Sequence, residues 1–194
     1  MDAHESNRDL ILATSLRLFA ERGYEAVGVA ELSESSSVTK PTLYHYFGSK
    51  RGLLDAIIAE RGGPLLKRVE EAAASANPGD VPLGLERIAE VMAKAARTDP
   101  EFARLRLCLA FAPAGSEGGA AAATFNAELF GLVEAYFAAA ATRHGNMRGR
   151  SRAYAATFIG TVDSYVGFYL AGQSELDEAV LRGFVRQFMY GIFS

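Results

Sequence analysis

Apolar residues recur along this chain of 194 residues at the three- and four-residue intervals that are typical of helices. Near the N-terminus, Leu12, Leu16 and Phe19 fall at i, i+4 and i+7, so they share one face of a helix. Arg8 begins this stretch, and Gly23, a common helix terminator, follows it. No segment shows the sustained two-residue alternation of a half-buried strand. The pattern therefore predicts an all-α protein.

Two shorter helices are predicted next, over residues 28–35 and 39–46, with a tight serine-rich turn between them. Apolar residues of both helices recur at spacings that direct them back toward the first helix. Ser49 follows a glycine and is a good N-cap for a long helix that begins directly after it. Three short helices, the last two joined by a turn of a few residues, form the helix-turn-helix plan. In that plan the last helix enters the major groove of DNA.

After this motif the composition shifts to alanine-rich, apolar helices. We expect a helix-turn-helix domain over residues 1–51 and an all-helical domain over residues 52–194. Glycine- and proline-containing breaks divide the second domain into five or six helices. These breaks are expected at residues 61–64, 77–82, 98–100, 113–119, 144–149 and 172–174. The first contains Gly62, Gly63 and Pro64, which end or kink a helix, and we interpret it either as a moving hinge or as a fixed bend.

Charge is distributed unevenly over the N-terminal part. The whole chain has a formal net charge of −3, which argues against nonspecific coating of nucleic acid. Residues 1–51 hold six basic and seven acidic side chains, a net charge of −1. Residues 38–51, in contrast, contain Lys40, Lys50 and Arg51 and no acidic residue, a net charge of +3. A helix that reads a DNA groove needs positive charge of this local kind.

The segment from Tyr24 to Lys50, and most closely its stretch SVTKPTLYHYFGSK, resembles the TetR family of transcriptional regulators. The resemblance implies an N-terminal three-helix DNA-binding domain and a helical C-terminal domain that binds a small-molecule effector and forms a homodimer. A protein of this kind binds a palindromic double-stranded DNA operator, most often as a repressor that the effector releases. The resemblance also implies six DNA contacts. They are Lys40, His45 and Tyr46 at base edges, and Thr42, Tyr44 and Lys50 at phosphates, the last with help from a helix dipole.

Two features depart from the family pattern. The second helix begins with Gly28, Val29 and Ala30, where the family usually has serine or threonine, which weakens the expectation of DNA contacts from that helix end. The glycine of the family's turn is replaced by Ser37. A positive φ angle at Ser37 would therefore carry some backbone strain.

The C-terminal domain shows no constellation of side chains suited to catalysis. The three histidines of the chain lie far apart and far from the only cysteine, Cys108, so neither a metal site nor a cofactor is predicted and no enzyme is expected. Cys108 lies in an apolar run and is interpreted as a buried thiol. A single cysteine fits a reducing compartment, and the polar N-terminus does not resemble a secretory leader. We expect a cytoplasmic protein.

Aromatic and apolar residues of the C-terminal domain exceed what one small bundle must bury. The resemblance implies that its helices enclose a pocket for a small apolar or amphipathic effector. The candidate lining residues, which include two charged residues in apolar helix faces, are Phe102, Leu105, Arg106, Leu109, Phe130, Phe158 and Asp163.

The last predicted helix, residues 177–193, has an apolar face wider than one partner helix needs. Together with the helix before it, this face is a candidate subunit interface of a homodimer. Phe184 and Phe188 are the residues predicted to lie in that interface.

Residues 153–172 are long and apolar enough to be compared with a membrane span, but hydroxyl side chains and tyrosines interrupt them. A buried helix and no membrane contact are expected. Two other functions remain open for the chain. One is a helical small-molecule carrier or enzyme whose N-terminal helices are structural, and the other is a module that binds protein through the aromatic residues 43–47. Steeply salt-dependent DNA binding would distinguish a DNA-binding regulator from both.

Overall fold

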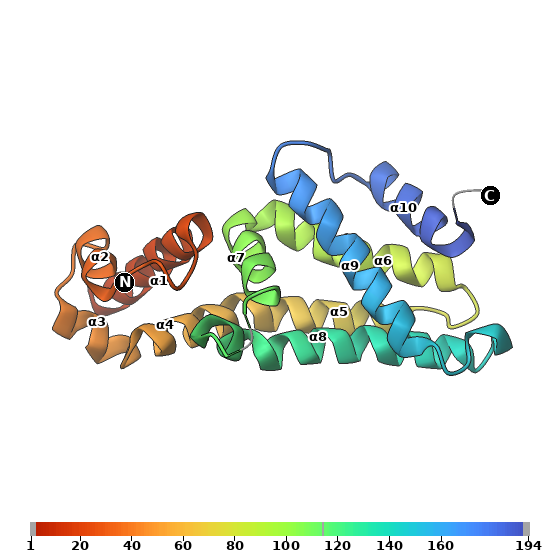
Figure 1. Cartoon of the computed structure of the whole chain (residues 1–194), viewed down its shortest axis with the longest axis horizontal. Coiled ribbons are helices and arrows are strands. Elements are labelled where there is room, and N and C mark those ends of the chain that lie inside the picture. The colour runs from red at the N-terminus through yellow and green to blue at the C-terminus, as the bar shows by residue number, and fades with distance from the viewer. Residues whose placement is uncertain (1–2, 114, 192–194) are drawn as a thin grey trace. The chain divides into compact units, whose positions relative to one another are not determined.

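The computed structural model describes residues 3–113 and 115–191, which form helices joined mostly by short turns. The α-helices are α1 (Ala3–Arg22), α2 (Val29–Ser35), α3 (Lys40–Phe47), α4 (Lys50–Ile57), α5 (Gly63–Ser75), α6 (Val81–Thr98), α7 (Pro100–Ala110), α8 (Glu117–Ala141), α9 (Ser151–Leu170) and α10 (Glu178–Tyr190) (Figure 1). A π-helical turn (Ile58–Gly62) and a 3-10 turn (Gly145–Met147) complete the helical elements. No strand occurs within these described residues, so the predicted all-α fold class is confirmed.

The two helices of the predicted DNA-binding segment, α3 and α4, each begin after a residue with a short hydroxyl side chain. Thr39 precedes α3, and its hydroxyl oxygen accepts a hydrogen bond from the Thr42 amide at 3.3 Å. Ser49 acts in the same way for α4, accepting from the Gly52 amide at 2.9 Å. Each contact satisfies an amide that the first turn of a helix leaves without a backbone partner. The predicted N-cap Ser49 is confirmed, and α3 begins within one residue of its predicted start.

The turn between α2 and α3 contains a residue with a positive φ angle at the position where the family has glycine. Ser37 has a φ angle of 53°, a left-handed conformation that costs a residue with a side chain about 1–2 kcal/mol. The amides of Ser37 and Val38 donate to the carbonyl groups of Glu34 and Ser33, each at 3.0 Å, and so close the end of α2. These hydrogen bonds help to hold the strained turn that joins the two helices of the motif.

The predicted break at residues 61–64 is not a loop. The chain remains helical through the π-helical turn Ile58–Gly62, which leads directly into α5. Pro64 has no amide proton, and in a regular α-helix its ring would clash with the carbonyl group four residues earlier. A π-helical turn is wider and relieves this clash. The glycine–proline sequence therefore marks a change of helix type rather than a helix end.

The internal contacts divide the chain into two compact units. Unit 1 comprises residues 1–63 and 101–125, and unit 2 comprises residues 64–100 and 126–194. Unit 1 extends beyond the predicted domain of residues 1–51 because α7 and the start of α8 contribute apolar side chains to the core of the helix-turn-helix. The motif is therefore part of a larger packed body.

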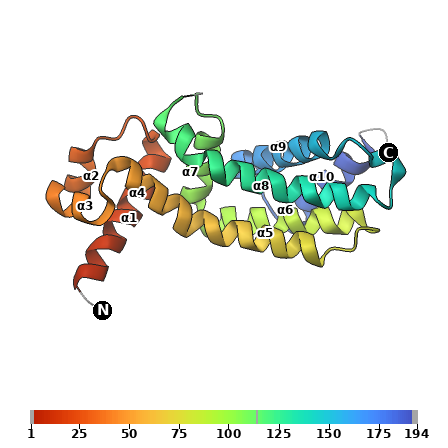
Figure 2. The ribbon, with the colours of Figure 1, turned by 90° about the horizontal axis from the view of Figure 1, so that it is seen from below.

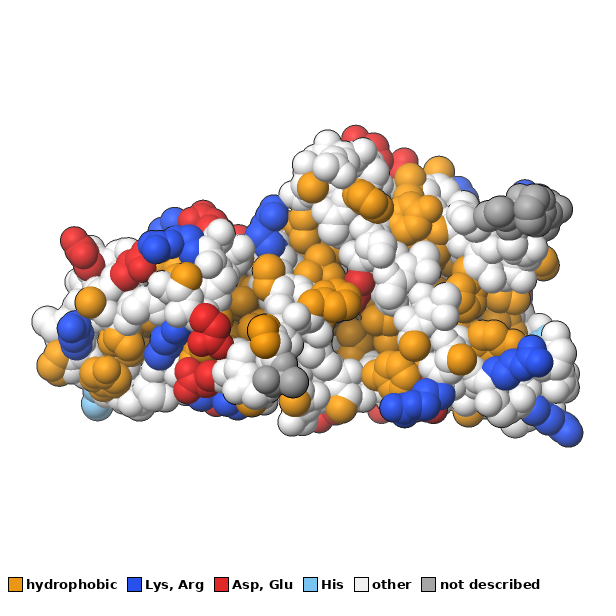
Figure 3. All heavy atoms as spheres, in the orientation of Figure 1, with side chains coloured by type: hydrophobic (Ala, Val, Ile, Leu, Met, Phe, Trp, Pro, Cys, Tyr) orange, Lys and Arg blue, Asp and Glu red, His pale blue; other side chains and the backbone are white. Residues whose placement is uncertain are grey.

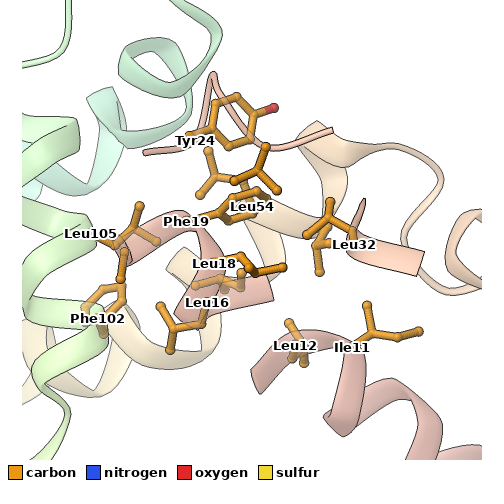
Figure 4. Packing of buried hydrophobic residues seen from close by; sticks show 14 of the residues in the cluster. Ile11, Leu12, Leu16, Leu18, Phe19, Tyr24, Leu32, Leu54, Phe102 and Leu105 are labelled. Atoms are coloured by element: carbon orange, nitrogen blue, oxygen red, sulfur yellow. The ribbon is translucent and has the colours of Figure 1, made fainter. Parts of the chain in front are cut away.

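One apolar cluster forms the core of unit 1 (Figure 4). Phe19 of α1, Leu32 of α2 and Leu54 of α4 are fully buried in it. Phe102 and Leu105 of α7 belong to the same cluster, and Figure 4 shows them beside the side chains of α1. The apolar stripe predicted for the first helix is thus buried, and part of its covering comes from a helix far along the sequence.

Unit 2 is a helical bundle in which α6 packs against both α9 and α10. Figure 2 shows α5, α6 and α8 running along the length of this unit. Tyr136 of α8 donates a hydrogen bond to the Val81 carbonyl oxygen, at 3.1 Å, at the start of α6. Gly84 makes room for the phenol, because a Cβ atom there would lie 2.0 Å from the Tyr136 hydroxyl oxygen. Burial raises the pKa of Tyr136 to about 12.

The comparison of α9 with a membrane span is settled by its surroundings. Phe158, Val162 and Val166 of α9 are buried against other helices of unit 2. None of the described helices is long and apolar enough to cross a membrane.

Candidate nucleic-acid interface

α3 turns one face to the core of unit 1 and the opposite face to solvent. Leu43 is fully buried, and Phe47, four residues later, packs against the same cluster. Successive residues of an α-helix are about 100° apart around the axis, so Pro41 and His45 point away from that core. Both are exposed. Pro41, which the sequence suggests only as a helix starter, therefore joins the candidate contact residues.

Five of the six predicted DNA-contacting residues lie on this exposed strip or beside it. Lys40, Tyr44 and His45 are exposed, and Tyr44 retains 46% of its possible surface. Thr42 and Tyr46 are half-buried on one flank of the strip. The Tyr46 ring meets the His45 ring edge-on, with centroids 5.4 Å apart. The predicted residues thus form one continuous surface along α3.

The sixth residue, Lys50, lies in the first turn of α4. Its ammonium nitrogen lies over the ring of Tyr24, 4.1 Å from the ring centroid. The negative face of an aromatic ring attracts a cation, so Tyr24 restrains the position of the charge. The first-turn amides of α4 add positive potential at the same helix end. An anion placed there would meet both the ammonium group and these amides.

Tyr24 is itself held by the start of α8. Its hydroxyl donates a hydrogen bond to the Glu117 carboxylate, and the Gly118 amide donates to Glu25 Oε1 at 3.2 Å. Arg51 donates to the Glu117 carbonyl oxygen at 3.4 Å. Burial, followed by the hydrogen bond to Glu117, raises the pKa of the Tyr24 hydroxyl well above its ordinary value. The Tyr24 hydroxyl therefore remains a hydrogen-bond donor at neutral pH. Its hydrogen bond to Glu117 helps to hold the Tyr24 ring under Lys50.

Two of the three cations predicted for this edge are available for phosphate groups. Arg51 pairs with Asp55 on the next turn of α4, at 2.8 Å. Lys40 has no ion-pair partner within the described part of the chain. Figure 3 shows Lys or Arg, histidine and apolar side chains together at the end of unit 1 where α3 lies in Figure 1. The positive potential of the surface thus depends mainly on Lys40 and Lys50.

The seven predicted effector-binding residues do not come together in one place. Phe102, Leu105 and Leu109 belong to the buried core of unit 1. Phe130 and Phe158 lie in unit 2. Phe130 is covered by an arginine of α9, whereas Phe158 is fully buried. These side chains serve as core or packing residues within their own units.

The two charged members of that set are buried as predicted. Arg106 and Asp163 retain 6% and 7% of their possible surface, and neither lacks a partner in the protein, so their burial is compensated. Cys108 is exposed, so the prediction of a buried thiol is wrong. The buried side of α7 is centred on Leu105 and Leu109, and Cys108 lies off that side.

Two hollows open on the surface of unit 2. The first, of about 810 Å³, is bordered by the end of α8, the α8–α9 loop, α9 and α10, and its walls include Phe137, Tyr154 and Phe188. The second has a volume of about 850 Å³ and is rich in carboxylates. Its acidic lining residues are Glu86, Glu90, Glu175, Asp177 and Glu178. None of the seven predicted effector-binding residues is part of either lining.

The two predicted dimer residues lie mostly inside the single chain. Phe184 retains 2% of its possible surface and stacks on Tyr165, with ring centroids 5.1 Å apart. Phe188 is half-buried, with its centroid 6.0 Å from that of Phe137 and 5.7 Å from that of Phe158. The wide apolar face of α10 is covered largely by α6, α8 and α9 of the same chain. An interface with a second copy would therefore use other side chains of α9 and α10.

Fold and site together define a helix-turn-helix protein with a helical C-terminal unit. Residues 11–57 match the family described as bacterial regulatory proteins, tetR family. The transcriptional regulator EthR of Mycolicibacterium smegmatis is 28% identical over 134 residues, which cover 68% of this chain and 56% of that protein. The chain thus spans little more than half of this relative and a smaller part of other curated regulators that it resembles.

Solved structures share the fold over nearly the whole chain. The regulator FadR of Bacillus subtilis, in complex with stearoyl-CoA, has a TM-score of 0.76 at 18% identity, with 95% of this chain and 98% of that chain covered. AibR, in complex with isovaleryl coenzyme A and operator DNA, has a TM-score of 0.71 at 21% identity, with 93% and 97% covered. Residues 11–57 thus carry the helix-turn-helix region of the tetR family of bacterial regulatory proteins, and the chain as a whole shares the fold of these solved regulators.

Proposed function

We propose that this protein is a homodimeric transcriptional repressor that binds a palindromic DNA operator and leaves it when a small apolar or amphipathic effector binds. The observation that carries the proposal is the exposed strip of α3, which lies between Lys40 and Lys50 in a segment without a carboxylate. A helix of this polarity suits the major groove, and the flanking cations suit the phosphates on either side.

The geometry supports a division of roles along the strip. Lys40 and His45 are exposed on α3 and would contact base edges, where donors can distinguish base pairs. Tyr44 and Thr42 lie on opposite flanks of the strip and would reach phosphates of the two strands. Lys50 would bind one phosphate together with the first-turn amides of α4. Base contacts specify the sequence in this arrangement, and phosphate contacts set the register.

A homodimer is supported by the second face of α9. Small side chains recur on it, and a large apolar side chain near its end, Phe168, retains 53% of its possible surface. The exposed small residues are Ala153, Ala156, Gly160 and Ser164. They would let the same helix of a second copy approach closely around a two-fold axis. The α3 helices of the two copies would then bind the two half-sites of a palindrome.

The role of an effector is supported by proteins of similar fold. The FadR structure contains stearoyl-CoA, and the AibR structure contains isovaleryl coenzyme A together with operator DNA. The helical unit 2 of this chain has hollows large enough for ligands of moderate size, since typical ligand sites are about 300–1,000 Å³. A ligand held there would favour the DNA-free state if it bound that state more tightly.

The test begins with selection of a duplex from a random pool and measurement of its affinity over a salt series. Lys50→Ala should weaken binding to all duplexes about equally and reduce the salt slope by about one. Lys40→Ala should instead reduce the preference for the operator over a mutated operator, by about 1–3 kcal/mol. Lys94→Ala removes an exposed lysine of α6 and serves as the charge-matched control.

Similar behaviour of Lys40→Ala and Lys50→Ala on every sequence would contradict the division of roles. The proposed function itself would be wrong if no duplex were selected at low salt by protein that is shown to be folded.

A further inference from the structure

The first hollow of unit 2 has an aromatic floor. Phe137 and Phe184 are almost fully buried beneath it and support the half-buried rings of Tyr154, Tyr165 and Phe188, which face the hollow. The rings of Tyr154 and Phe188 both lie near that of Phe137, with centroids 5.7 and 6.0 Å from the Phe137 centroid. Met147 of the α8–α9 loop adds a flexible apolar wall. A surface of this kind suits a hydrocarbon chain.

The hollow lies along one flank of α9, beside the face proposed for the dimer. Tyr154, Thr161 and Tyr165 line it, and they recur at spacings of seven and four residues on that flank. Gly160 and Ser164, on the small-residue face, are not among its lining residues. Thr157 also lines the hollow and lies one turn from both Ala153 and Gly160, so the hollow borders the small-residue face.

Hydrogen-bond donors line the hollow without a carboxylate among them. His144 Nε2 is buried and has no hydrogen-bond partner among the described residues. The Thr157 and Thr161 hydroxyls donate to carbonyl oxygens of their own helix at 3.0 and 2.8 Å, so their protons are already used. Gln187 and the tyrosine hydroxyls remain as further polar groups of the lining. A buried nitrogen of this kind calls for a polar group of a ligand.

Positive charge is concentrated at the border of the hollow. Residues 135–162 contain four arginines and no acidic residue, a net charge of +4. Arg152 pairs with Glu134 at 3.6 Å, but the arginines at 143, 148 and 150 are exposed. They are adjacent or close in sequence to His144 and Met147, which line the hollow. In Figure 3, Lys or Arg side chains lie beside apolar ones at the end of unit 2 where the α8–α9 loop lies.

We propose that this hollow binds an amphiphile made of an acyl chain and an anionic head group. The chain lies on the aromatic floor, and the head group lies at the arginines of the α8–α9 loop. The second hollow is less suited to such a ligand, because five carboxylates against three arginines give its lining a net negative charge. A free fatty acid and an acyl thioester of a phosphate-bearing carrier share this chemistry. The binding is argued from these side chains alone, whereas a role of the ligand as an effector rests on the proposed function.

The absence of tryptophan from the chain permits a local reporter. Gln187 is exposed and lines the first hollow, so Gln187→Trp places the only tryptophan of the chain beside the expected position of the acyl chain. Leu83 is exposed and lines the second hollow, so Leu83→Trp is the matched control. Palmitate and palmitoyl-CoA, titrated separately below their micelle concentrations, should shift the emission of the first variant saturably and leave the second unchanged. Acetyl-CoA, with too short a chain to cover the floor, should bind much more weakly.

The head-group site is tested by charge reversal in the reporter variant. Arg148→Glu with Arg150→Glu should weaken binding about tenfold or more, since two attractive charges become repulsive. The control is Lys67→Glu with Arg68→Glu, two reversals on exposed residues of α5, and it should bind as before. Loss of binding for palmitate alone, for palmitoyl-CoA alone, or for both identifies the source of the head group and supports the site.

The proposal is overturned if neither probe shifts the emission of the Gln187→Trp variant. It is also overturned if the reversal at Arg148 and Arg150 leaves the affinity unchanged, or if the Leu83→Trp reporter responds equally. These titrations contain no DNA. A protein that binds the probe but no operator would refute the proposed function and leave this site intact, whereas operator binding without probe binding would refute the site alone.

Discussion

Two neighbouring glycines of the helical segment before α5 have opposite surroundings. A Cβ atom on Gly62 would lie 2.8 Å from two ring carbons of Phe125 and 3.4 Å from Cζ of Phe102. A Cβ atom on Gly63 would meet nothing within 4 Å. Gly62 is buried and Gly63 is exposed. The two alanine variants therefore differ in the steric contact while sharing the backbone effect of replacing glycine.

The expected magnitudes follow from this comparison. Either substitution restricts the unfolded chain and favours the helix by up to about 1 kcal/mol. Overpacking against a buried ring costs about 1–3 kcal/mol, and only Gly62→Ala meets that cost. The backbone gain cancels in the difference, so Gly62→Ala should be less stable than Gly63→Ala by about 1–3 kcal/mol. In a chain of this length each kcal/mol shifts Tm by about 2–4 °C.

Thermal and denaturant unfolding, followed by circular dichroism, measure the difference directly. Adding Phe125→Leu should restore much of the stability of Gly62→Ala and should not help Gly63→Ala, since the coupling is local. Equal midpoints for the two alanine variants would refute the steric argument. Gly63→Ala also tests the hinge interpretation of this segment, because a moving hinge predicts a weaker effector response at unchanged effector affinity.

Three further outcomes are expected. Tyr24→Phe keeps the ring under Lys50 and should bind the operator like the parent, whereas Tyr24→Leu should bind about two- to fivefold more weakly in gel-shift titrations, since an exposed cation–π contact contributes about 0.5–1 kcal/mol. Equal affinities would remove this role of the ring. Phe168→Glu should yield folded monomers in sedimentation velocity, whereas Phe184→Glu should melt at a lower temperature because it buries a charge inside the chain. A folded Phe168→Glu dimer would contradict the interface. The raised pKa of Tyr136 predicts that stability falls between about pH 10 and about 12, since the unfolded chain loses this proton first. Tyr136→Phe should reduce that fall, and an unchanged pH profile would contradict burial as its cause.

The sequence by itself determined the helices of the DNA-binding motif and the exposed strip of α3. Thr39 and Ser49 begin helices because a hydroxyl oxygen satisfies a first-turn amide, an interaction that spans only three residues. Leu43 is buried and His45 exposed because the apolar spacing of a short amphipathic helix leaves one choice of face. All of these features depend on residues that are close in sequence.

Only the tertiary structure decided how the C-terminal helices use their apolar side chains. Several of these helices, α8 and α9 above all, are apolar on more than one side, so periodicity does not tell a core face from a ligand wall or a subunit interface. Phe102 and Leu105 thus cover the helix-turn-helix core, and Phe184 stacks inside unit 2. The hollow beside the α8–α9 loop likewise arises from segments distant in sequence. Local patterns specify a helix and its outer face, whereas contacts between distant segments select which apolar face is buried.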